Sequence, residues 1–325
     1  MYFPPTSDQA LLWEQYCKEI EKRSNGQVKI TYFPGGQLFD GPGTWDAVRK
    51  GVADLGYVTT GHASGRFLVT EAVTVMTGYP SAFVVSRVAD DYYKKFMPKE
   101  FSDYQVLAAA GNSPMVIFSR KPFYKLEDFK GTKTRTSGRQ ADQVKLLGVA
   151  PVSMPAGESV DALSKGVIDS SLTSMEAAKT WRLAEVCKYC TLSWSVFSPP
   201  AYYTVMNKPK YDSLPADIKA IFDKVSEEWV DKSALMSNNT DVLGAQFSKE
   251  KGMTFIDLSP EEAKRWRDLV APAADAYIQT MVGKGFSKQE VQGWLDYIKS
   301  RIDFWLKEQI KRGIKSPIGP PEIRG

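Results

Sequence analysis

Apolar and polar residues alternate with two different periods along the first two thirds of the chain, which predicts helices and strands in turn. A helix is predicted from about residue 7 to Gly26, because Ala10, Trp13, Cys17 and Ile20 recur on one face. The same reasoning predicts strands at 27–33, 54–59 and 105–119 and helices at 45–50 and 81–97. Such alternation predicts an α/β protein with mostly parallel sheets flanked by helices.

The stretch 131–174 is the clearest example of this rhythm, and the chain is organised around it. Its pattern predicts a strand, a helix with Val144, Leu146 and Leu147, a second short strand, a second helix and a third strand at 167–172. Gly138 breaks the first strand, and Arg135 stands just before that break.

Arg135 is the first candidate for binding chemistry. An arginine at the carboxyl end of a strand, beside a helix N-terminus, can clamp a carboxylate through two parallel charge-assisted bonds. The alternative is a solvated arginine at a strand end, since most charged side chains are simply exposed. The spacing alone leaves both interpretations open.

The pattern changes after about residue 213. A long helix is predicted from Leu214 to about residue 239, and a short strand follows at 253–256. Two further helices begin at capping boxes that open with Ser259 and Ser287. Their tryptophans and tyrosines indicate packing rather than function.

Composition bounds the classes of protein that are possible. With 325 residues and 43% hydrophobic content the chain is long enough for two domains. The net charge of +4 is spread out, so we expect no nucleic-acid partner, and no apolar run is long enough for membrane insertion. The opening Tyr2-Phe3-Pro4-Pro5 resembles the end of a strand, so we expect a processed N-terminus from which a signal sequence has been removed.

The three cysteines indicate no cofactor. Cys17 lies on the apolar face of the first helix and is interpreted as a buried thiol. Cys187 and Cys190 have the C-x-x-C spacing, which is compatible with a structural disulfide, with two inert thiols or with redox chemistry. A zinc site would need a second pair, so we expect no metal and no cofactor.

The sequence lacks the parts that most enzymes require. His62 is its only histidine, and no nucleophile motif, zinc-protease motif, P-loop or dinucleotide fingerprint accompanies it. An anion clamp without catalytic groups favours a binding protein. An enzyme or a regulatory ligand-binding domain on a related two-lobed fold remains the alternative.

Five segments together resemble one family. The run 26–38 (GQVKITYFPGGQL) is similar to a segment of the substrate-binding proteins of tripartite ATP-independent periplasmic (TRAP) transporters, the DctP family. Further matches follow in the same order at 50–55 (KGVADL), 126–135 (LEDFKGTKTR), 162–169 (ALSKGVID) and 211–217 (YDSLPAD). They cover most of the chain.

The resemblance implies a two-lobed periplasmic binding protein fold with a long helix spanning both lobes. It implies domain I at 1–130 plus 212–250 and domain II at 131–211 plus 251–325, with the ligand cleft between them. It also implies a periplasmic monomer, not an enzyme, that closes on a small organic acid and delivers it to membrane permease subunits of a TRAP transporter. Arg135 stands where the carboxylate-binding arginine of the family stands.

Two departures from the family bear on the ligand. Members that bind sugar acids carry a second arginine where this chain has the region of Met154, and their ligand-binding asparagine aligns with Trp194. If Trp194 lines the cleft, the pocket favours an aromatic or apolar monocarboxylate, such as an indole or phenyl alkanoate or an aromatic amino or keto acid. Trp194 is equally compatible with packing between domains, and a small aliphatic keto or hydroxy acid or a sugar acid is the alternative ligand.

Other candidates follow from their positions at the carboxyl ends of predicted strands, where parallel sheets bind ligands. Phe3 ends the first strand, and Thr60, His62 and Arg66 follow the strand that begins at residue 54. Arg66 also aligns with a family arginine near the site, although support of its loop is an alternative. The remaining candidates are Thr173, Glu176, Met154, Phe197 and Tyr202, the last three with core packing as an equal alternative.

Overall fold

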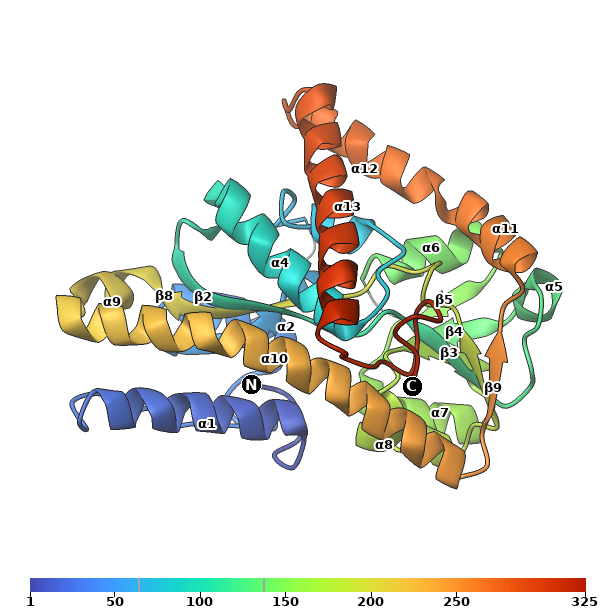
Figure 1. Ribbon diagram of the computed structural model, residues 1–325, viewed down its shortest axis with the longest axis horizontal. Coiled ribbons are helices and arrows are strands. Elements are labelled where there is room, and N and C mark those ends of the chain that lie inside the picture. The colour runs from blue at the N-terminus through green and yellow to red at the C-terminus, as the bar shows by residue number, and fades with distance from the viewer. Residues whose placement is uncertain (64, 137) are drawn as a thin grey trace.

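The computed structural model describes residues 1–63, 65–136 and 138–325 and consists of two lobes, each built around its own sheet (Figure 1). Lobe I contains three strands in the order β1 (Leu55–Thr59), β8 (Ala201–Asn207) and β2 (Tyr104–Gly111). Lobe II contains six strands in the order β5 (Ala150–Val152), β4 (Lys133–Arg135), β6 (Ser170–Thr173), β3 (Val116–Ser119), β7 (Tyr189–Leu192) and β9 (Thr254–Asp257). The two-lobed α/β architecture predicted from the sequence is present.

Helices cover both sheets. Lobe I carries α1 (Asp8–Arg23), α2 (Gly41–Arg49), α3 (Ala72–Val75), α4 (Ala82–Phe96), α12 (Pro272–Gly283) and α13 (Lys288–Lys311). Lobe II carries α5 (Leu126–Phe129), α6 (Gln140–Leu146), α7 (Ser159–Ser164), α8 (Ala177–Thr180) and α11 (Pro260–Val270). Short turns and one further helix complete the chain: η1 (Thr60–Ala63), η2 (Lys99–Phe101), η3 (Ala156–Glu158), η4 (Leu183–Glu185) and α9 (Lys208–Ser213).

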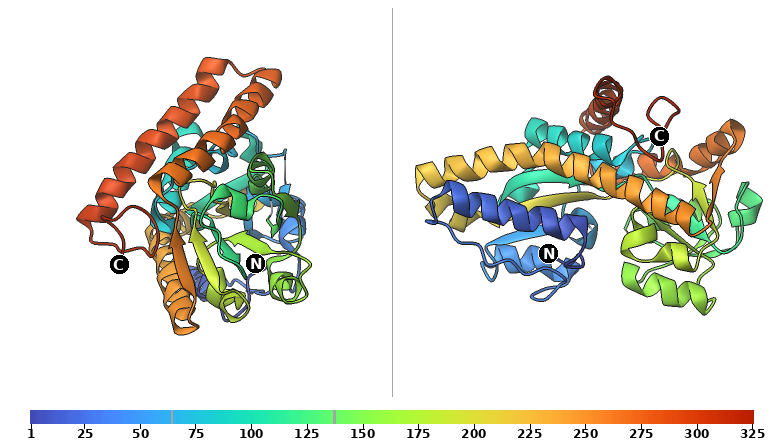
Figure 2. Two further views of the ribbon diagram at one scale, coloured as in Figure 1. Left: turned by 90° about the vertical axis from the view of Figure 1, so that its right-hand side faces the viewer. Right: turned by 60° about the horizontal axis from the view of Figure 1, so that its bottom comes forward.

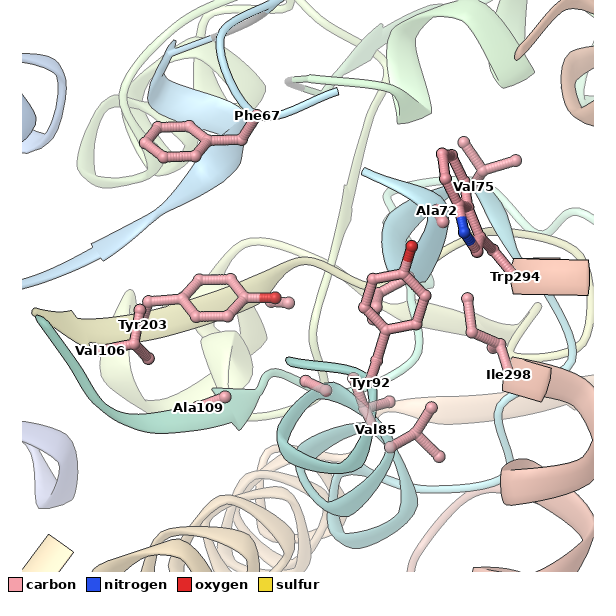
Figure 3. Close-up of a cluster of buried hydrophobic side chains, with 14 of the residues drawn as sticks. Phe67, Ala72, Val75, Val85, Tyr92, Val106, Ala109, Tyr203, Trp294 and Ile298 are labelled. Carbon is pink, nitrogen blue, oxygen red and sulfur yellow. The ribbon is translucent and has the colours of Figure 1, made fainter. Parts of the chain in front are cut away.

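The core of lobe I extends from its sheet to the C-terminal helices (Figure 3). Tyr92 of α4 is fully buried there, with Trp294 and Ile298 of α13 in the same cluster. The helical pattern of this last segment therefore serves packing, as the sequence predicts.

The stretch 131–174 folds as predicted, into β4, α6, β5, α7 and β6. β4 is parallel to both of its neighbours, β5 and β6, whereas β3 is antiparallel to β6 and β7. Both pairings of the lobe I sheet are antiparallel, because β8 returns from lobe II and runs between β1 and β2. Parallel strands therefore prevail around Arg135 but not in lobe I.

The chain crosses between the lobes at 112–115, at 193–200, along α10 (Ala216–Glu250) and again between α11 and α12. α10 is longer than predicted, and it packs against α1 and α4 at one end and against α8 at the other (Figure 2). The contact with α8 needs a glycine, because a Cβ on Gly244 would lie 2.4 Å from the carbonyl oxygen of Met175.

These crossings correct the domain boundaries derived from the resemblance. β3 belongs to the lobe II sheet although it was placed in 1–130, and β8 belongs to the lobe I sheet although it was placed in 131–211. α12 and α13 pack on lobe I, whereas only α11 joins lobe II. The single strand predicted at 105–119 is likewise two strands in different sheets, separated by the crossing Asn112-Ser113-Pro114-Met115.

Two predicted strands are absent from the described residues of lobe I. The segment 27–33 has the expected alternation of exposed and half-buried side chains but forms no strand, and residues 1–5 form none either. A strand needs a hydrogen-bonded neighbour, and these segments have no regular one in the structure.

Cys187 and Cys190 are buried free thiols, so neither the disulfide nor an exposed redox pair is present. Burial raises the pKa of Cys187 to about 12, which keeps it protonated and unreactive. Among the described residues there is no helix with the length and apolarity needed to cross a membrane, and no group of three or more acidic, histidine or cysteine side chains that could hold a metal.

Candidate functional site

Arg135 is the last residue of β4, at the carboxyl end of the parallel part of the lobe II sheet. Its Nε donates a hydrogen bond to the carbonyl oxygen of Met154 at 3.1 Å, which fixes the plane of the guanidinium. No described carboxylate forms an ion pair with it, and burial lowers the pKa of the guanidinium against the opposing effect of Tyr202 and Tyr2. Arg135 is thus an oriented, partly buried cation whose two terminal nitrogens remain available for an anion.

Lobe I presents aromatic side chains toward this cation. Tyr2 stacks on Phe3 with ring centroids 4.7 Å apart, and Tyr202 stacks on Tyr57 at 5.2 Å. The hydroxyls of Tyr2 and Tyr202 are 3.0 Å apart. We call these four residues the aromatic wall. Phe3, Tyr57 and Tyr202 are themselves buried, and the wall places one pair of phenolic hydroxyls near Arg135.

The sequence reasoning named Phe3 but missed its neighbour Tyr2. The two rings stack on each other, so Tyr2 lies on the same side of the chain as Phe3, and its place beside a candidate was the available signal. Tyr202 was a candidate with core packing as an equal alternative, and the structure places it in the aromatic wall. Its position at the start of β8, directly after a crossing between the lobes, was the available signal.

The candidates after β1 divide into two groups. His62 lies against Tyr2 with ring centroids 5.2 Å apart, burial lowers its pKa, and the buried Thr60 hydroxyl has no hydrogen-bond partner in the described part of the chain. Arg66 instead forms an ion pair with Asp46 at 3.0 Å and donates to the hydroxyl of Tyr104 at 2.5 Å. Thr60 and His62 therefore border the aromatic wall, whereas Arg66 supports its loop.

The lobe II candidates are also placed differently from one another. Met154 contributes its carbonyl to Arg135 and packs its side chain on the core of lobe II, where the half-buried Trp194 also packs. Thr173 is half-buried at the end of β6, and Phe197 is fully buried in a second core cluster. No hydrogen bond or cation–π contact joins Trp194 or Phe197 to Arg135 among the described side chains, and Phe197 packs in the core.

Glu176 belongs to a buried carboxyl pair at the junction of the lobes. Its backbone N–H donates to Asp241 Oδ1 on α10 at 3.1 Å, and the Ser174 hydroxyl donates to Glu176 Oε1 at 3.1 Å. The hydroxyl of Ser113, in the crossing at 112–115, donates to the other oxygen of Asp241. Asp241 thus connects the crossing, α10 and lobe II, and nothing in its sequence surroundings indicated this role.

Burial decides the protonation of this pair. Burial, opposed by the hydrogen bond from Ser113 and assisted by the neighbouring Glu176 carboxyl, raises the pKa of Asp241 to about 8. Burial also raises the pKa of Glu176, which is only 2% exposed. Asp241 is therefore protonated at neutral pH, as a neutral partner of Ser113.

A second link between the lobes lies near the other end of the site. Arg139, which precedes α6 in lobe II, forms an ion pair with Glu71, which precedes α3 in lobe I. Its guanidinium also lies 5.5 Å from the ring centroid of Tyr277 on α12. A cavity of about 450 Å³ between α3, α6 and α12 is lined by Arg139 but not by Arg135. The pair therefore holds the lobes together beside the site rather than within it.

Comparison with known proteins identifies relatives over most of the chain. The profile of a family described as bacterial extracellular solute-binding protein, family 7 (DctP), matches residues 1–280. A solute-binding protein of Albidiferax ferrireducens is 29% identical over 278 residues, covering 81% of this chain and 79% of that protein. The C4-dicarboxylate-binding periplasmic protein DctP of Rhodobacter capsulatus is 25% identical over 263 residues, covering 78% of each chain.

Solved structures share the whole architecture. A TRAP periplasmic solute-binding protein of Desulfovibrio salexigens superimposes with a TM-score of 0.84 at 26% identity, covering 93% of each chain. A marine metagenome TRAP protein specific for aromatic acids, solved with metahydroxyphenylacetate, gives a TM-score of 0.85 at 24% identity and covers 92% of this chain and 97% of that one. A Rhodoferax ferrireducens TRAP protein with copurified benzoate gives 0.85 at 24% identity, covering 94% and 97%.

Proposed function

The chain belongs to family 7 of the bacterial extracellular solute-binding proteins, the DctP family, and on this premise we propose that it binds an aromatic or apolar monocarboxylate through Arg135. Membership confirms the sequence prediction of a periplasmic TRAP receptor that is not an enzyme. Such receptors bind small organic acids and work with membrane permease subunits. A monomeric state and the Arg135 salt bridge remain predictions.

The observation that carries the proposal is the oriented guanidinium of Arg135, which has no carboxylate partner among the described residues. A buried cation is costly when it is unpaired, so an anion that enters the site gains a strong, weakly screened interaction. Because the cation belongs to lobe II and the aromatic wall belongs to lobe I, a ligand that contacts both favours the closed arrangement of the lobes.

The aromatic wall supports the apolar half of the proposal. Flat rings stack on tyrosine faces, and Tyr2 lies close enough to Arg135 to affect the pKa of its guanidinium. The fold accommodates ligands of this kind, since related proteins were solved with metahydroxyphenylacetate, with benzoate and with mandelate. Trp194 remains a proposed contributor, with core packing as its alternative.

One observation favours a second candidate, a small hydroxy or keto acid or a sugar acid. The paired hydroxyls of Tyr2 and Tyr202 and the unpaired hydroxyl of Thr60 are polar groups that could read ligand hydroxyls. A fold neighbour from Chromohalobacter salexigens was solved with D-glucuronate at 16% identity. The two candidates differ in how many of these polar groups a ligand must satisfy.

Thermal-shift screening separates the two candidates. We expect phenyl and indole alkanoates to raise the melting temperature by about 5 °C or more at saturating concentration, because binding to the folded state alone stabilises it. Uronates and aliphatic hydroxy acids are the matched comparison set, with the corresponding amides as controls for the carboxylate. A large shift with uronates and none with arylalkanoates would establish the second candidate instead.

The link between the lobes at Arg139 gives a further prediction. We expect Arg139→Gln to weaken binding of the best acid about tenfold, because a partly buried ion pair that favours closure is lost. The control is Lys145→Gln on α6, which removes an exposed pair with Asp142 inside lobe II. Calorimetric titration measures both affinities. An unchanged affinity with a lowered melting temperature would mean that the Arg139 pair stabilises the fold but does not assist closure.

A further inference from the structure

Asn112 is the first residue of the crossing at 112–115 and follows directly after β2. Its backbone N–H donates to the carbonyl oxygen of Pro200 at 3.0 Å, which extends the antiparallel pairing of β2 with β8 by one residue. In that pairing Ala110 is the partner of Tyr202. Side chains two residues apart on one strand share a face, so Asn112 lies on the same face as Tyr202 and diagonally across from it.

The orientation of the Asn112 amide follows from one hydrogen bond. The backbone N–H of Ser113 donates to Asn112 Oδ1 at 2.8 Å. Only the oxygen of an amide can accept such a bond, so the amide nitrogen with its two hydrogens is left for other partners. Burial raises the pKa of the Tyr202 phenol, and the half-buried Asn112 amide opposes this shift, as a donor that faces the phenolic oxygen does.

The next link is formed by the phenolic hydroxyls of Tyr202 and Tyr2, whose oxygens are 3.0 Å apart. Each phenol has one hydrogen to donate. Because the Tyr202 oxygen faces an amide donor, its own hydrogen is directed to the Tyr2 oxygen, and the hydrogen of Tyr2 is left for a third partner. Tyr2 is half-buried whereas Tyr202 is only 7% exposed, so Tyr2 is the end of this series that a ligand can reach.

We propose that Asn112 is a positioning residue for ligand binding, which orients the hydroxyls of Tyr202 and Tyr2 so that Tyr2 donates a hydrogen bond to the carboxylate held by Arg135. We call Asn112, Tyr202 and Tyr2 the donor chain. This inference rests on the proposed function, since it needs a carboxylate at Arg135. It adds the requirement that the ligand group beside Tyr2 be an acceptor, and hydrogen bonds to a charged acceptor are the strong ones.

The donor chain connects the junction of the lobes with Arg135. Asn112 belongs to the crossing at 112–115, so the chain begins where the polypeptide passes from lobe I to lobe II. Burial lowers the pKa of the Arg135 guanidinium, and both Tyr202 and Tyr2 oppose this shift, so the other end of the chain lies near that cation. In a site of low dielectric constant, hydrogen bonds in series polarise and strengthen one another.

A double-mutant cycle tests the donor chain. The probe is phenylacetate, or D-glucuronate if thermal-shift screening selects the sugar acid, and calorimetric titration measures the affinities. Asn112→Ala and Tyr202→Phe should each weaken binding about tenfold, because each leaves the Tyr2 hydroxyl without the neighbour that orients it. The double variant should bind about as weakly as either single variant, since a chain that is already broken has no second link to lose.

Asn112→Asp is the sharper variant, because it keeps the oxygen that accepts from Ser113 and replaces only the donor nitrogen by an acceptor. Tyr202 should then donate to the new carboxylate and Tyr2 to Tyr202, so that Tyr2 presents lone pairs to the acid. We expect the affinity to fall at least about a hundredfold. The loss should be smaller in the Tyr202→Phe background, whereas direct charge repulsion would act equally in both backgrounds.

Gln105→Ala is the matched control for these variants. It removes another half-buried amide, which lies near the opposite end of β2, and it should bind the probe as the wild type does. Melting temperatures without ligand establish that every variant is folded.

Two results would overturn the donor chain. Additive losses in the cycle, about a hundredfold in the double variant, would mean that Asn112 and Tyr202 act independently. Wild-type affinity in Asn112→Asp would mean that no donor is needed at this position. The proposed function fails separately, if Arg135→Ala keeps its affinity. Loss of binding in Arg135→Ala together with additive losses in the cycle would remove only the donor chain.

Discussion

Arg135→Ala is expected to lower the affinity for the best acid at least about a hundredfold, because truncating one partner of a buried, hydrogen-bonded charge pair costs about 2–5 kcal/mol. Arg135→Lys should lose most of this affinity too, since a point charge cannot form the two parallel bonds of a guanidinium. The melting temperature without ligand should change little. Among the described residues Arg135 makes only one hydrogen bond, to the Met154 carbonyl, and its burial without an anion is itself unfavourable.

Arg120 provides a matched control for this experiment. It is an exposed arginine beyond β3 that donates a single bond to the carbonyl of Leu163 at 3.1 Å, with no contact to the aromatic wall among the described residues. Arg120→Ala should leave binding intact. Isothermal titration measures the affinities of Arg135→Ala, Arg135→Lys and Arg120→Ala, and thermal melts measure their stability without ligand. A collapse of stability in Arg135→Ala without ligand would make this arginine structural, and retained binding would place the acid elsewhere.

The second large effect concerns the pH dependence of stability at Asp241. The folded protein holds the proton of this carboxyl up to a pKa of about 8, whereas an unfolded aspartate loses it near pH 4. The stabilisation is therefore complete below about pH 4 and is lost as the pH rises through 8, by up to about 1.4 kcal/mol per pH unit. We expect the free energy of unfolding to fall between pH 6.5 and 8 on this account.

Asp241→Asn should remove this slope. The amide keeps the shape of the protonated carboxyl, can accept from the Glu176 N–H and can donate to Ser113 without titrating. Other groups titrate nearby, since burial lowers the pKa of His62 and of the Met1 amine, so the quantity to compare is the difference between wild type and Asp241→Asn at each pH.

Asp241→Ala should be destabilised by about 2 kcal/mol or more at pH 6.5, because it leaves the buried Ser113 hydroxyl and the Glu176 N–H unpaired. Urea melts measured across this pH range supply the free energies. A wild-type protein whose slope equals that of Asp241→Asn would show that Asp241 is ionised in the folded state. Glu176→Gln would then be the next variant to measure, because burial also raises the pKa of Glu176.

The candidate site residues differ in how much of the chain is needed to predict their positions. Arg135 could be identified from the sequence because its position depends only on β4 and α6, which lie within one short stretch of the chain. Its carbonyl partner Met154 lies within the same stretch. Tyr202 and Asp241 come from β8 and α10, far away in the sequence, and only the crossings of the chain bring them to the junction of the lobes.

Trp194 and Phe197 show that a position after a strand does not by itself fix where a side chain points. Both follow β7, at the carboxyl end where ligands bind in parallel sheets, so position alone made them candidates. β7, however, has an antiparallel neighbour in β3, and Phe197 turns into the core behind the sheet. The direction of a side chain after a strand depends on packing that periodicity does not record.

The sequence by itself determined the two helix starts capped by Ser259 and Ser287 and the strand–helix rhythm of 131–174. These depend on interactions between residues a few positions apart, which a linear pattern expresses fully. Tertiary structure alone decided which strands share a sheet, where the lobes divide and whether 27–33 pairs at all. A strand is completed by hydrogen bonds to a neighbour that can lie anywhere in the chain, so alternation marks a candidate edge but never its partner.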